Sequence, residues 1–342
     1  MGAGAAAGAA RGPGRLLIRL PNWLGDALLA RPMLHALRGT FPGAPCMAVA
    51  PAPLLELLAA EGGFAASAAW PPAGGGRRAA LRAARGFAPD TALVLPPSFS
   101  SAWFARRSGA RERIGYAHEG RSVLLTRALA RAPRGDLHLS EEYLALARAT
   151  GAAALALSDL QIAPGARTAA RALRAAHPAL VAGPHAVLGP GAVYGPAKQW
   201  GIERFAALGR RLATRGLGVA VCGTAAEAGA CAALAAAIGP AAVSLAGRTP
   251  LPALAALCAE AALAVCNDSG LAHLAAAAGA PTVVVFGSTS SAWTAPLGRR
   301  VRVLQHAPPC APCFRRACRI GYGCLAAVTV DAADAACREL AA

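Results

Sequence analysis

Short apolar runs alternate with amphipathic helical stretches along the 342 residues of this chain, and the pattern occurs twice. Strands that alternate with helices in this way build parallel sheets that helices cover. The expected strands are residues 15–20, 46–50 and 91–96 in the first half, and 186–191, 217–223, 242–247, 263–268 and 282–287 in the second. We therefore predict an α/β fold with two parallel sheets, and a helix over 24–37 that follows the first strand.

The length of the chain exceeds what one hydrophobic core usually serves, so the two halves predict two domains. Pro and Gly residues surround a short Arg/Ala helix between the halves, as is typical of an interdomain connection. The expected boundaries are a first domain at 15–165, a linker at 166–184 and a second domain at 185–342. Ligands of such sheets bind beyond the carboxyl ends of the strands, so we expect the chemistry in the loops there.

Two segments bear on localisation. Residues 1–14 are mainly Ala and Gly with a single Arg and no leucine-rich core, which predicts a disordered leader and not a signal peptide. The uncharged stretch 228–247 is mostly Ala and is broken at Gly239-Pro240, so we interpret it as helix, turn and strand and not as a membrane span. A cytoplasmic protein is expected.

The chain carries 34 basic and 17 acidic residues, a formal net charge of +17. Such a charge attracts polyanions, among them nucleic acid, anionic membrane surfaces, nucleotide diphosphates and phosphorylated glycolipids. The sequence has no RNA-binding aromatic signature, no basic region with heptads and no zinc-finger His pair, which argues against nucleic acid. Every basic residue except Lys198 is Arg, so this one lysine is a candidate for a specific role.

Asp26 is the first candidate for chemistry. It stands in "RLPNWLGDALLARPML" (19–34), where a strand passes through a Pro-Asn turn into a helix. A carboxylate at such a turn faces the ligand side of the sheet and suits a general base for an acceptor hydroxyl. The alternative is an Asp that only stabilises the positive end of the helix dipole.

Lys198 is the second candidate. In "LGPGAVYGPAKQW" (188–200) it follows a strand and a Gly/Pro loop, just before the helix expected at 202–216. Small residues let backbone N–H groups approach a phosphate, and one ammonium can neutralise charge that develops there. The motif is not a Walker A sequence, and a solvated lysine in a connecting loop is the alternative.

A third motif, "AVCNDSGLAHLAAAAGAPTVVVFG" (264–287), places Asp268, Ser269 and Gly270 between a strand and a helix. Asp268 could accept hydrogen bonds from sugar or ribose hydroxyls, while the free amides of the helix cradle a phosphate. An ordinary helix cap is the alternative. His273, one turn into the helix, faces either the pocket or the core.

Taken together, five motifs resemble the lipopolysaccharide heptosyltransferases of glycosyltransferase family 9, and most closely their heptosyltransferase II branch. They are "LPNWLGD" (20–26), "PGAVYGPAKQW" (190–200), "LAGRTPL" (245–251), "NDSGLAHLAAAAGAP" (267–281) and "APPCAPCFRRACRIGYGCL" (307–325), in the order of the family. The resemblance implies a GT-B fold, in which two Rossmann-like domains face each other across a cleft. The N-terminal domain would hold the acceptor and the C-terminal domain ADP-heptose.

The resemblance also implies roles for residues. Asp26 matches the catalytic base, and Lys198 matches the lysine at the donor diphosphate. The donor-binding set it implies is Tyr194, Gly195, Lys198, Glu227, Gly247, Thr249, Asp268, Ser269, Gly270 and His273. The implied reaction inverts the anomeric carbon and needs no cofactor or metal, and the sequence lacks an Asp-x-Asp motif.

Basic clusters fit an acceptor that bears Kdo carboxylates and lipid A phosphates at an anionic inner-membrane surface, because Arg binds such groups in a bidentate manner. They are Arg77, Arg78, Arg82 and Arg85 at helical spacing, and Arg106, Arg107, Arg111 and Arg113 after the strand near 93. From the last cluster we take Arg111 and Arg113, together with Asn22, as acceptor-binding candidates. Solvated helix faces are the alternative for many of these arginines.

Four cysteines, Cys310, Cys313, Cys318 and Cys324, have the count and crowding of a four-thiolate zinc site. Their spacing is irregular, so we expect reduced thiols in a structured loop and keep structural zinc as the alternative. The other six cysteines stand in apolar surroundings that are typical of buried residues.

The expected activity is transfer of heptose from ADP-heptose to the first heptose of the lipopolysaccharide inner core, which is built on Kdo-lipid A. A sibling enzyme, such as heptosyltransferase I or III, would use another acceptor with the same donor motifs. A basic nucleic-acid-binding protein is the alternative from a different class.

Overall fold

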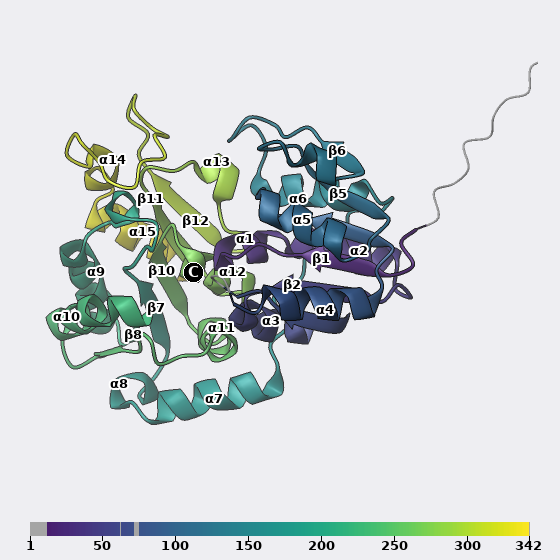
Figure 1. Ribbon diagram of the computed structural model, residues 1–342. Coiled ribbons are helices and arrows are strands. Elements are labelled where there is room, and N and C mark those ends of the chain that lie inside the picture. Colours follow the sequence, from purple (N-terminus) through teal and green to yellow (C-terminus); the bar gives the residue numbers. More distant parts are fainter. Residues whose placement is uncertain (1–11, 62, 72–74, 342) are drawn as a thin grey trace, which may run out of the picture.

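The computed structural model describes residues 12–61, 63–71 and 75–341. The predicted leader at 1–14 therefore lies outside the described residues, except for its last three. Within the described residues the chain forms two six-stranded sheets in which all neighbouring strands are parallel, with helices around both (Figure 1). We call residues 12–150 the N-lobe and residues 164–341 the C-lobe.

The N-lobe sheet has the strand order β3-β2-β1-β4-β5-β6. Its strands are β1 (Leu16–Arg19), β2 (Cys46–Ala50), β3 (Phe64–Ala69), β4 (Thr91–Val94), β5 (Glu112–Tyr116) and β6 (Arg127–Leu129). Its helices are α1 (Leu24–Leu29), α2 (Arg31–Thr40), α3 (Ala52–Leu58), η1 (Ala59–Glu61), α4 (Arg77–Phe87), α5 (Phe99–Arg107), η2 (Arg121–Leu124) and α6 (Leu139–Arg148).

The C-lobe sheet has the order β12-β11-β10-β7-β8-β9. Its strands are β7 (His185–Gly189), β8 (Gly218–Val221), β9 (Ala242–Ser244), β10 (Leu263–Asn267), β11 (Thr282–Phe286) and β12 (Val301–Gln305). Its helices are α7 (Pro164–Ala175), α8 (Pro178–Val181), η3 (Pro196–Lys198), α9 (Ile202–Thr214), η4 (Ala225–Glu227), α10 (Ala228–Ile238), α11 (Leu251–Ala259), α12 (Gly270–Ala277), α13 (Ser291–Thr294), α14 (Gly323–Ala326) and α15 (Val330–Ala341).

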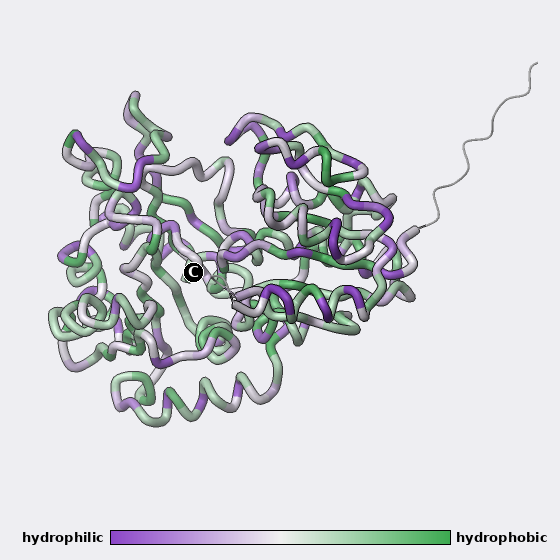
Figure 2. Tube along the Cα trace, viewed as in Figure 1, coloured by the Kyte–Doolittle hydropathy of each residue, from purple (hydrophilic) through white to green (hydrophobic). Residues whose placement is uncertain are grey.

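Both sheets are buried on both faces, which explains why their central strands are continuous apolar runs. On β1, Leu16 and Ile18 enter one core while Leu17 enters another, because successive side chains of a strand point to opposite faces. Figure 2 shows hydrophobic residues along the central strands of the C-lobe and hydrophilic residues on outer helices such as α4. The predicted α/β fold with two parallel sheets is confirmed.

The prediction of one helix over 24–37 was wrong in its continuity. The segment forms α1 and α2, with a break at Ala30. Pro32 has no backbone N–H with which to continue the helical ladder, so it stands at the start of a new helix instead. The stretch 228–247 forms α10, a Gly-Pro turn and β9, as predicted.

The lobes meet through apolar helix contacts and share part of one hydrophobic core. Helix α1 packs on α12, and α3 packs on α11 (Figure 1). The connecting segment 158–161 is fastened to both lobes, since Leu160 donates its N–H to the oxygen of Ala277 at 2.7 Å in the C-lobe. The domain boundaries given above, 15–165 and 185–342 around a linker at 166–184, stay a prediction.

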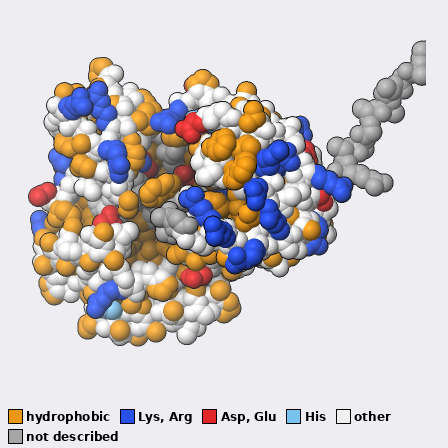
Figure 3. Space-filling model, in the orientation of Figure 1, with side chains coloured by type: hydrophobic (Ala, Val, Ile, Leu, Met, Phe, Trp, Pro, Cys, Tyr) orange, Lys and Arg blue, Asp and Glu red, His pale blue; other side chains and the backbone are white. Residues whose placement is uncertain are grey.

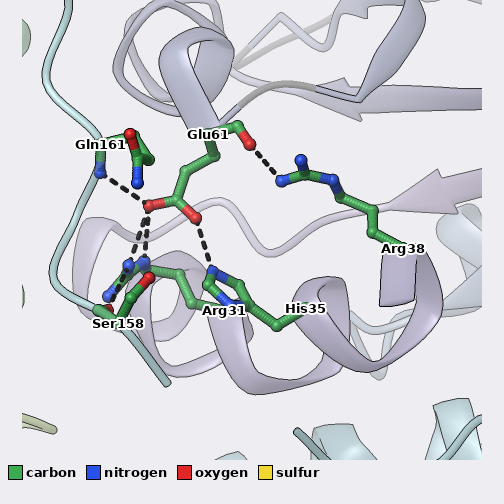
Figure 4. A network of polar contacts seen from close by, with 6 residues as sticks. All are labelled: Arg31, His35, Arg38, Glu61, Ser158 and Gln161. Atoms are coloured by element: carbon green, nitrogen blue, oxygen red, sulfur yellow. Dashed lines mark hydrogen bonds and ion pairs between the residues drawn. The ribbon is translucent and has the colours of Figure 1, made fainter. Parts of the chain in front are cut away.

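On the N-lobe side, this segment is held by a buried cluster around Glu61 (Figure 4). The carboxylate of Glu61, 4% exposed, accepts hydrogen bonds from Arg31 at 2.8 Å and His35 at 2.8 Å, and from the backbone N–H of Gln161 at 3.1 Å. Arg31 also donates to the oxygen of Ser158 at 2.9 Å. We call these residues the Glu61 clamp.

Candidate active site

Asp26 lies in the first turn of α1, just beyond the carboxyl end of β1. Burial raises the pKa of Asp26 to about 6, with a further increase from Asp268, although the charges of Lys198 and Arg131 oppose the rise. Two of these charged groups, Lys198 and Asp268, belong to the C-lobe and the third, Arg131, belongs to the N-lobe, so Asp26 lies where charged groups of both lobes meet. The carboxylate of Asp26 forms no hydrogen bond or ion pair with the residues that the structure describes, so it is free to accept a proton.

Opposite Asp26, three side chains from neighbouring strand ends of the C-lobe form one cluster. The ammonium of Lys198, in η3 after β7, lies 2.6 Å from Oδ2 of Asp268, which follows β10. Thr289, after β11, donates its hydroxyl to the same carboxylate oxygen. Strands β7, β10 and β11 are adjacent in the sheet, so their carboxyl ends deliver these residues to one place.

The N-terminus of α12 adjoins this cluster and points at the N-lobe. A Cβ atom on Gly270 would lie 3.1 Å from Cβ of Leu24, and a Cβ atom on Gly25 would lie 2.8 Å from Cδ2 of His273. Glycine at 25 therefore permits the close approach of α1 to α12. The sequence thus brings the two helix starts, with Asp26 on one and Ser269 and Gly270 on the other, to a common site.

Several buried polar atoms at this site have no hydrogen-bond partner among the described residues. They are Oγ of Ser269, Oγ of Ser288 and Nδ1 of His273. Burial lowers the pKa of His273 to about 4, although Asp268 opposes this change, so the imidazole is neutral at physiological pH. Unpartnered buried polar atoms are rare in proteins, and their gathering here marks a place that a polar ligand can satisfy.

Tyr194 and Gly195 shape the loop that carries Lys198. The ammonium of Lys198 lies 4.9 Å from the centre of the Tyr194 ring, a cation–π distance. The Tyr194 hydroxyl donates to the oxygen of Phe314, and Arg316 donates to the oxygen of Tyr194 at 2.7 Å. A Cβ atom on Gly195 would lie 2.6 Å from the oxygen of Arg316. The cysteine-rich segment thus supports the Lys198 loop.

Glu227, Gly247 and Thr249 lie beside this loop, beyond β8 and β9. Glu227 caps η4, because its Oε2 accepts hydrogen bonds from the N–H and the hydroxyl of Thr224 at 2.8 and 2.9 Å. A Cβ atom on Gly191 would lie 2.0 Å from the other oxygen of Glu227. Gly247, at φ +71°, packs against Ala225, and Thr249 is half-buried next to α11. Every donor-site candidate thus lies at the same edge of the C-lobe sheet.

The acceptor-binding candidates do not share one location. Asn22 is exposed near Asp26, and its Oδ1 accepts a hydrogen bond from Arg19. Arg111 and Arg113 lie at the amino end of β5, which is the opposite edge of the N-lobe sheet. Arg113 is also engaged locally, donating to the backbone oxygens of Leu124 and Ala110 at 2.8 and 2.7 Å. The structure therefore does not bring Arg111 and Arg113 together with Asp26.

The cysteine-rich segment has a structural role in this site. All four thiols are free, and within the described ranges no three His, Cys, Asp or Glu side chains are grouped so that they could hold a metal ion. The thiol of Cys318 accepts hydrogen bonds from the N–H groups of Ile320 and Tyr322 at 3.4 and 3.3 Å, which lower its pKa. Phe314 donates its N–H to the oxygen of Ser288 at 2.8 Å.

Three residues of the site were missed by the sequence reasoning. Trp23, 65% exposed, stands three residues before Asp26, and its place in the motif "LPNWLGD" (20–26) was a usable signal. Thr289 follows a strand that the sequence predicts, but threonine alone carries no signal. Arg131 approaches Asp26 from the segment after β6, and its Nε lies 2.7 Å from Oε2 of Glu142. Because β6 was not predicted, nothing in the sequence placed Arg131 near the site.

Comparison with known proteins identifies the family to which this site belongs. The sequence pattern of glycosyltransferase family 9 (heptosyltransferase) matches residues 77–322, well over half of the chain. Lipopolysaccharide heptosyltransferase 2 of Escherichia coli K12 is 29% identical over 311 residues, which cover 85% of this chain and 88% of that protein.

Solved structures agree with this match. The structure described as E. coli ADP-heptose lps heptosyltransferase II superposes with a TM-score of 0.80 at 28% identity, over 96% of this chain and 98% of that one. A family 9 glycosyltransferase of Veillonella parvula has the same fold, with a TM-score of 0.83 at 19% identity over 96% and 97% of the two chains. None of the described helices combines the length and the apolar character that crossing a membrane requires. The chain belongs to glycosyltransferase family 9, the heptosyltransferases, and is a glycosyltransferase of GT-B fold.

Proposed function

We propose that this enzyme transfers L-glycero-D-manno-heptose from ADP-heptose to the first heptose of the lipopolysaccharide inner core, on a Kdo-lipid A acceptor at the cytoplasmic face of the inner membrane. The observation that carries the proposal is that Asp26 of the N-lobe faces the Lys198–Asp268 pair of the C-lobe at the junction of the two sheets. The likeness in sequence and structure to heptosyltransferase II supports the choice of donor and acceptor.

In the proposed reaction, Asp26 is the general base. It takes the proton from the acceptor hydroxyl while that oxygen forms a bond to the anomeric carbon of the donor heptose. The bond from this carbon to the diphosphate oxygen breaks on the opposite side, so the configuration inverts and ADP leaves with the bonding electron pair. A pKa of about 6 suits this role, since the carboxylate is ionised at neutral pH and still basic.

Lys198 and the N-terminus of α12 stabilise the departing diphosphate. An ammonium has three N–H donors, and Asp268 occupies one of them, so Lys198 can reach a phosphate oxygen without leaving its partner. The free amides at Ser269 and Gly270 and the positive end of the helix dipole supply further charge stabilisation. These groups would take the role that a divalent metal ion plays in many other glycosyltransferases.

The other residues that would contact ADP-heptose are assigned from their places at the carboxyl edge of the C-lobe sheet and at the junction of the lobes. Tyr194 and Gly195 border the diphosphate with Lys198, and His273 is a neutral hydrogen-bonding group at the junction of the lobes. The oxygen of Glu227 that the helix cap leaves free suits a ribose hydroxyl, and Gly247 and Thr249 would border the adenine. Asn22 and the exposed Trp23 are the acceptor contacts closest in sequence to the base.

A transfer assay tests the proposal. The enzyme is incubated with ADP-heptose and Kdo-lipid A acceptors that carry zero, one or two heptoses, and the products are resolved by mass. We expect addition of one heptose to the acceptor that carries one. Preferential use of the acceptor with none or with two would assign the enzyme to a sibling activity. No transfer to any of the three, with ADP-heptose left intact, would overturn the proposal.

A further inference from the structure

The outer face of the N-lobe exposes large apolar side chains that no part of the described chain covers. Phe99 and Trp103 lie one helical turn apart on α5 and are 48% and 46% exposed. Val123 on η2, which packs against α5, is 79% exposed. Isolated exposed apolar residues are ordinary, but three on two adjoining elements form a patch. We call these three residues the apolar patch.

Arginines surround this patch. Those that are exposed on α4, on α5 and just before β5 are Arg77, Arg78, Arg82, Arg85, Arg106, Arg107 and Arg111. Figure 3 shows basic side chains around a hydrophobic group on this face of the N-lobe. Between residues 75 and 111 the sequence contains one acidic residue, Asp90. None of the seven arginines forms an ion pair with another described residue.

One of these arginines contacts the patch directly, and a second is joined to it through the backbone of α5. The guanidinium of Arg107 lies 5.9 Å from the centre of the Trp103 ring. Arg85 of α4 donates to the backbone oxygen of Arg107 at 2.8 Å, which joins the two helices. Helices α4 and α5 also pack on the same side of the sheet through one hydrophobic core. The patch and these arginines therefore lie on one continuous face of the N-lobe, formed by α4, α5 and η2.

One end of this surface lies at the edge of the N-lobe sheet that carries Asp26. Helices α4 and α5 begin after the carboxyl ends of β3 and β4, the edge of the sheet at which Asp26 also lies. Phe99 is the first residue of α5 and stands at this edge. An acceptor whose lipid part is held in a bilayer could thus present its sugar to Asp26 while the bilayer contacts this surface.

We propose that the apolar patch and its surrounding arginines form the surface by which this enzyme docks on a bilayer that contains anionic lipids. Aromatic rings favour the interface between head groups and acyl chains, and arginines bind the lipid phosphates around them. Each basic residue near such a surface strengthens binding about fivefold. The inference extends the proposed function, since it names the surface that meets the membrane, but it concerns binding and not transfer.

The chemistry of the surface favours a bilayer over a nucleic acid. Backbone recognition of nucleic acid needs a basic groove, and aromatic stacking on bases needs rings that flank it. Here the apolar residues occupy the centre, and one of them, Val123, is an aliphatic side chain that cannot stack on bases. An apolar centre within a cationic rim matches the layered order of acyl chains and phosphates in a membrane interface.

Co-sedimentation with vesicles tests the docking surface. The full-length enzyme is mixed with vesicles of 70% phosphatidylethanolamine and 30% phosphatidylglycerol, or of phosphatidylcholine alone. We expect strong binding to the anionic vesicles that weakens in high salt, and at least tenfold weaker binding for the triple variant Phe99→Ser, Trp103→Ser, Val123→Ser. Replacement of Arg82 and Arg107 by Gln should weaken binding more than tenfold.

Matched variants of the C-lobe serve as controls. Val181→Ser removes an apolar side chain that is 58% exposed, and replacement of Arg167 and Arg171 by Gln removes two exposed charges of α7, one of which, Arg171, pairs with Glu260 at 3.6 Å. Both should bind vesicles like the unmodified enzyme. The triple variant should keep its melting temperature and its transfer rate with a delipidated, soluble acceptor. Because binding is measured without donor or acceptor, it remains informative if the proposed transfer activity fails.

Three results would overturn the docking surface. The first is equal vesicle binding by the triple variant and the unmodified enzyme. The second is tight, salt-dependent binding of single- or double-stranded DNA with no preference for anionic vesicles, which would assign the surface to nucleic acid. The third is a dimer in sedimentation velocity that the triple variant converts to a monomer while vesicle binding is unchanged, which would make the patch an interface between two copies of this chain.

Discussion

The carboxyl edges of the two sheets meet at one site, yet they hold their charged groups in different ways. In the C-lobe, Lys198 pairs with Asp268, and Thr289 donates to the same carboxylate. The neighbouring Asn267 accepts a hydrogen bond from Trp200 and donates one to Pro190. In the N-lobe, Asp26 has no such partner among the described residues, and burial raises its pKa to about 6.

This difference matches two chemical tasks. A group that stabilises developing negative charge acts best when it is already in place, because no reorganisation is then needed during the reaction. A general base must instead keep a lone pair free and a pKa near the working pH. In the proposed reaction, the C-lobe edge would stabilise the leaving group with charged groups that are already held in place, and the N-lobe edge offers one unpaired carboxylate as the base. The following substitutions test that division.

Asp26→Asn should have the largest effect on transfer. We expect kcat/KM to fall about 10³-fold, because the amide cannot accept the proton of the acceptor hydroxyl. The dissociation constant of ADP, measured by calorimetry, should be unchanged, since the N-lobe base does not touch the nucleotide. A loss of ADP affinity equal to the loss of rate would contradict the division between the two edges.

The same substitution, which lowers activity, should increase the stability of the fold. The pKa of Asp26 is raised in the folded protein, so ionisation of this carboxylate destabilises the fold above its unfolded pKa and has no effect below it. Asp26→Asn should therefore increase the free energy of unfolding by about 3 kcal/mol at pH 7.5, as a rise of about two pK units implies, and most of this gain should be lost near pH 4. A gain that persists at pH 4 would mean that the amide stabilises the fold in some other way.

Lys198→Met should affect both donor binding and the fold. We expect a roughly 100-fold loss in kcat/KM with weaker ADP affinity, because the leaving diphosphate loses its cation. The variant also leaves Asp268, 3% exposed, without its ion partner, which should cost about 3 kcal/mol of unfolding free energy.

The double variant Lys198→Met, Asp268→Asn separates these two effects. It removes the uncompensated carboxylate, so it should recover most of the stability while transfer stays low. Lys198→Arg, which keeps the charge, is the matched control and should retain more activity than the methionine variant. Normal ADP affinity in Lys198→Met would remove this lysine from the phosphate site.

The sequence predicted which residues meet at the candidate site better than it predicted the strands around that site. Asp26, Lys198 and Asp268 each follow an apolar run that proved to be a parallel strand, and parallel strands deliver their carboxyl ends to one edge. This rule needs no knowledge of side-chain packing. The roles assigned to these residues came from the family resemblance and stay predictions until they are tested by substitution.

The failures at the site have a common physical origin in two strands of the N-lobe that have little apolar signal. Strand β5 contains Glu112 and Arg113, and β6 is a three-residue edge strand that is mostly exposed. Because β5 was missed, Arg111 and Arg113 were expected beyond the carboxyl end of the strand near 93. Helix α5 instead returns the chain to the amino edge, where both arginines lie. Arg131 was missed for the same reason, since it follows β6.

Glu61→Gln should affect stability and leave the chemistry intact, because the Glu61 clamp lies away from both carboxyl edges. Burial alone would raise the pKa of Glu61, but the hydrogen bond from His35 and the charge of Arg31 lower it below its ordinary value. The substitution leaves the buried guanidinium of Arg31 without an ion partner, so the free energy of unfolding should fall by about 3 kcal/mol. Urea denaturation measures this loss.

The loss should also depend on pH in a defined direction. A depressed carboxyl pKa stabilises the fold above the unfolded value, near 4.3, and this stabilisation is lost as pH falls through the lower folded value. The difference between Glu61→Gln and the unmodified enzyme should therefore shrink in strong acid. Glu141→Gln, which breaks an exposed pair with Arg148, is the control and should cost less than about 0.5 kcal/mol. A large fall in kcat at saturating substrates would instead tie the clamp to catalysis.

Arg131→Gln should have a small and specific effect on the pH dependence of transfer, although it also removes the ion partner of the buried Glu142. The charge of Arg131, which Glu142 holds at 2.7 Å, lowers the pKa of Asp26 against the larger effect of burial. Without that charge the base protonates at higher pH, so the acid limb of the profile of kcat/KM against pH should move upward. At pH 5.5 the variant should lose about threefold more activity than the unmodified enzyme, as half a pK unit implies, and at pH 8.5 the two should agree.

Arg131→Lys keeps the charge but changes the contact with Glu142, so it distinguishes an electrostatic effect on Asp26 from a structural one. If charge is what matters, the lysine variant keeps the acid limb where the unmodified enzyme has it, and only the glutamine variant moves it. Equal shifts in both variants would mean that the packing of Arg131 against Glu142 and Trp293 positions the base. If neither variant moves the acid limb, the pKa of Asp26 does not depend on Arg131. The pKa of Asp26 would then be set by burial and by the charges of Lys198 and Asp268 alone.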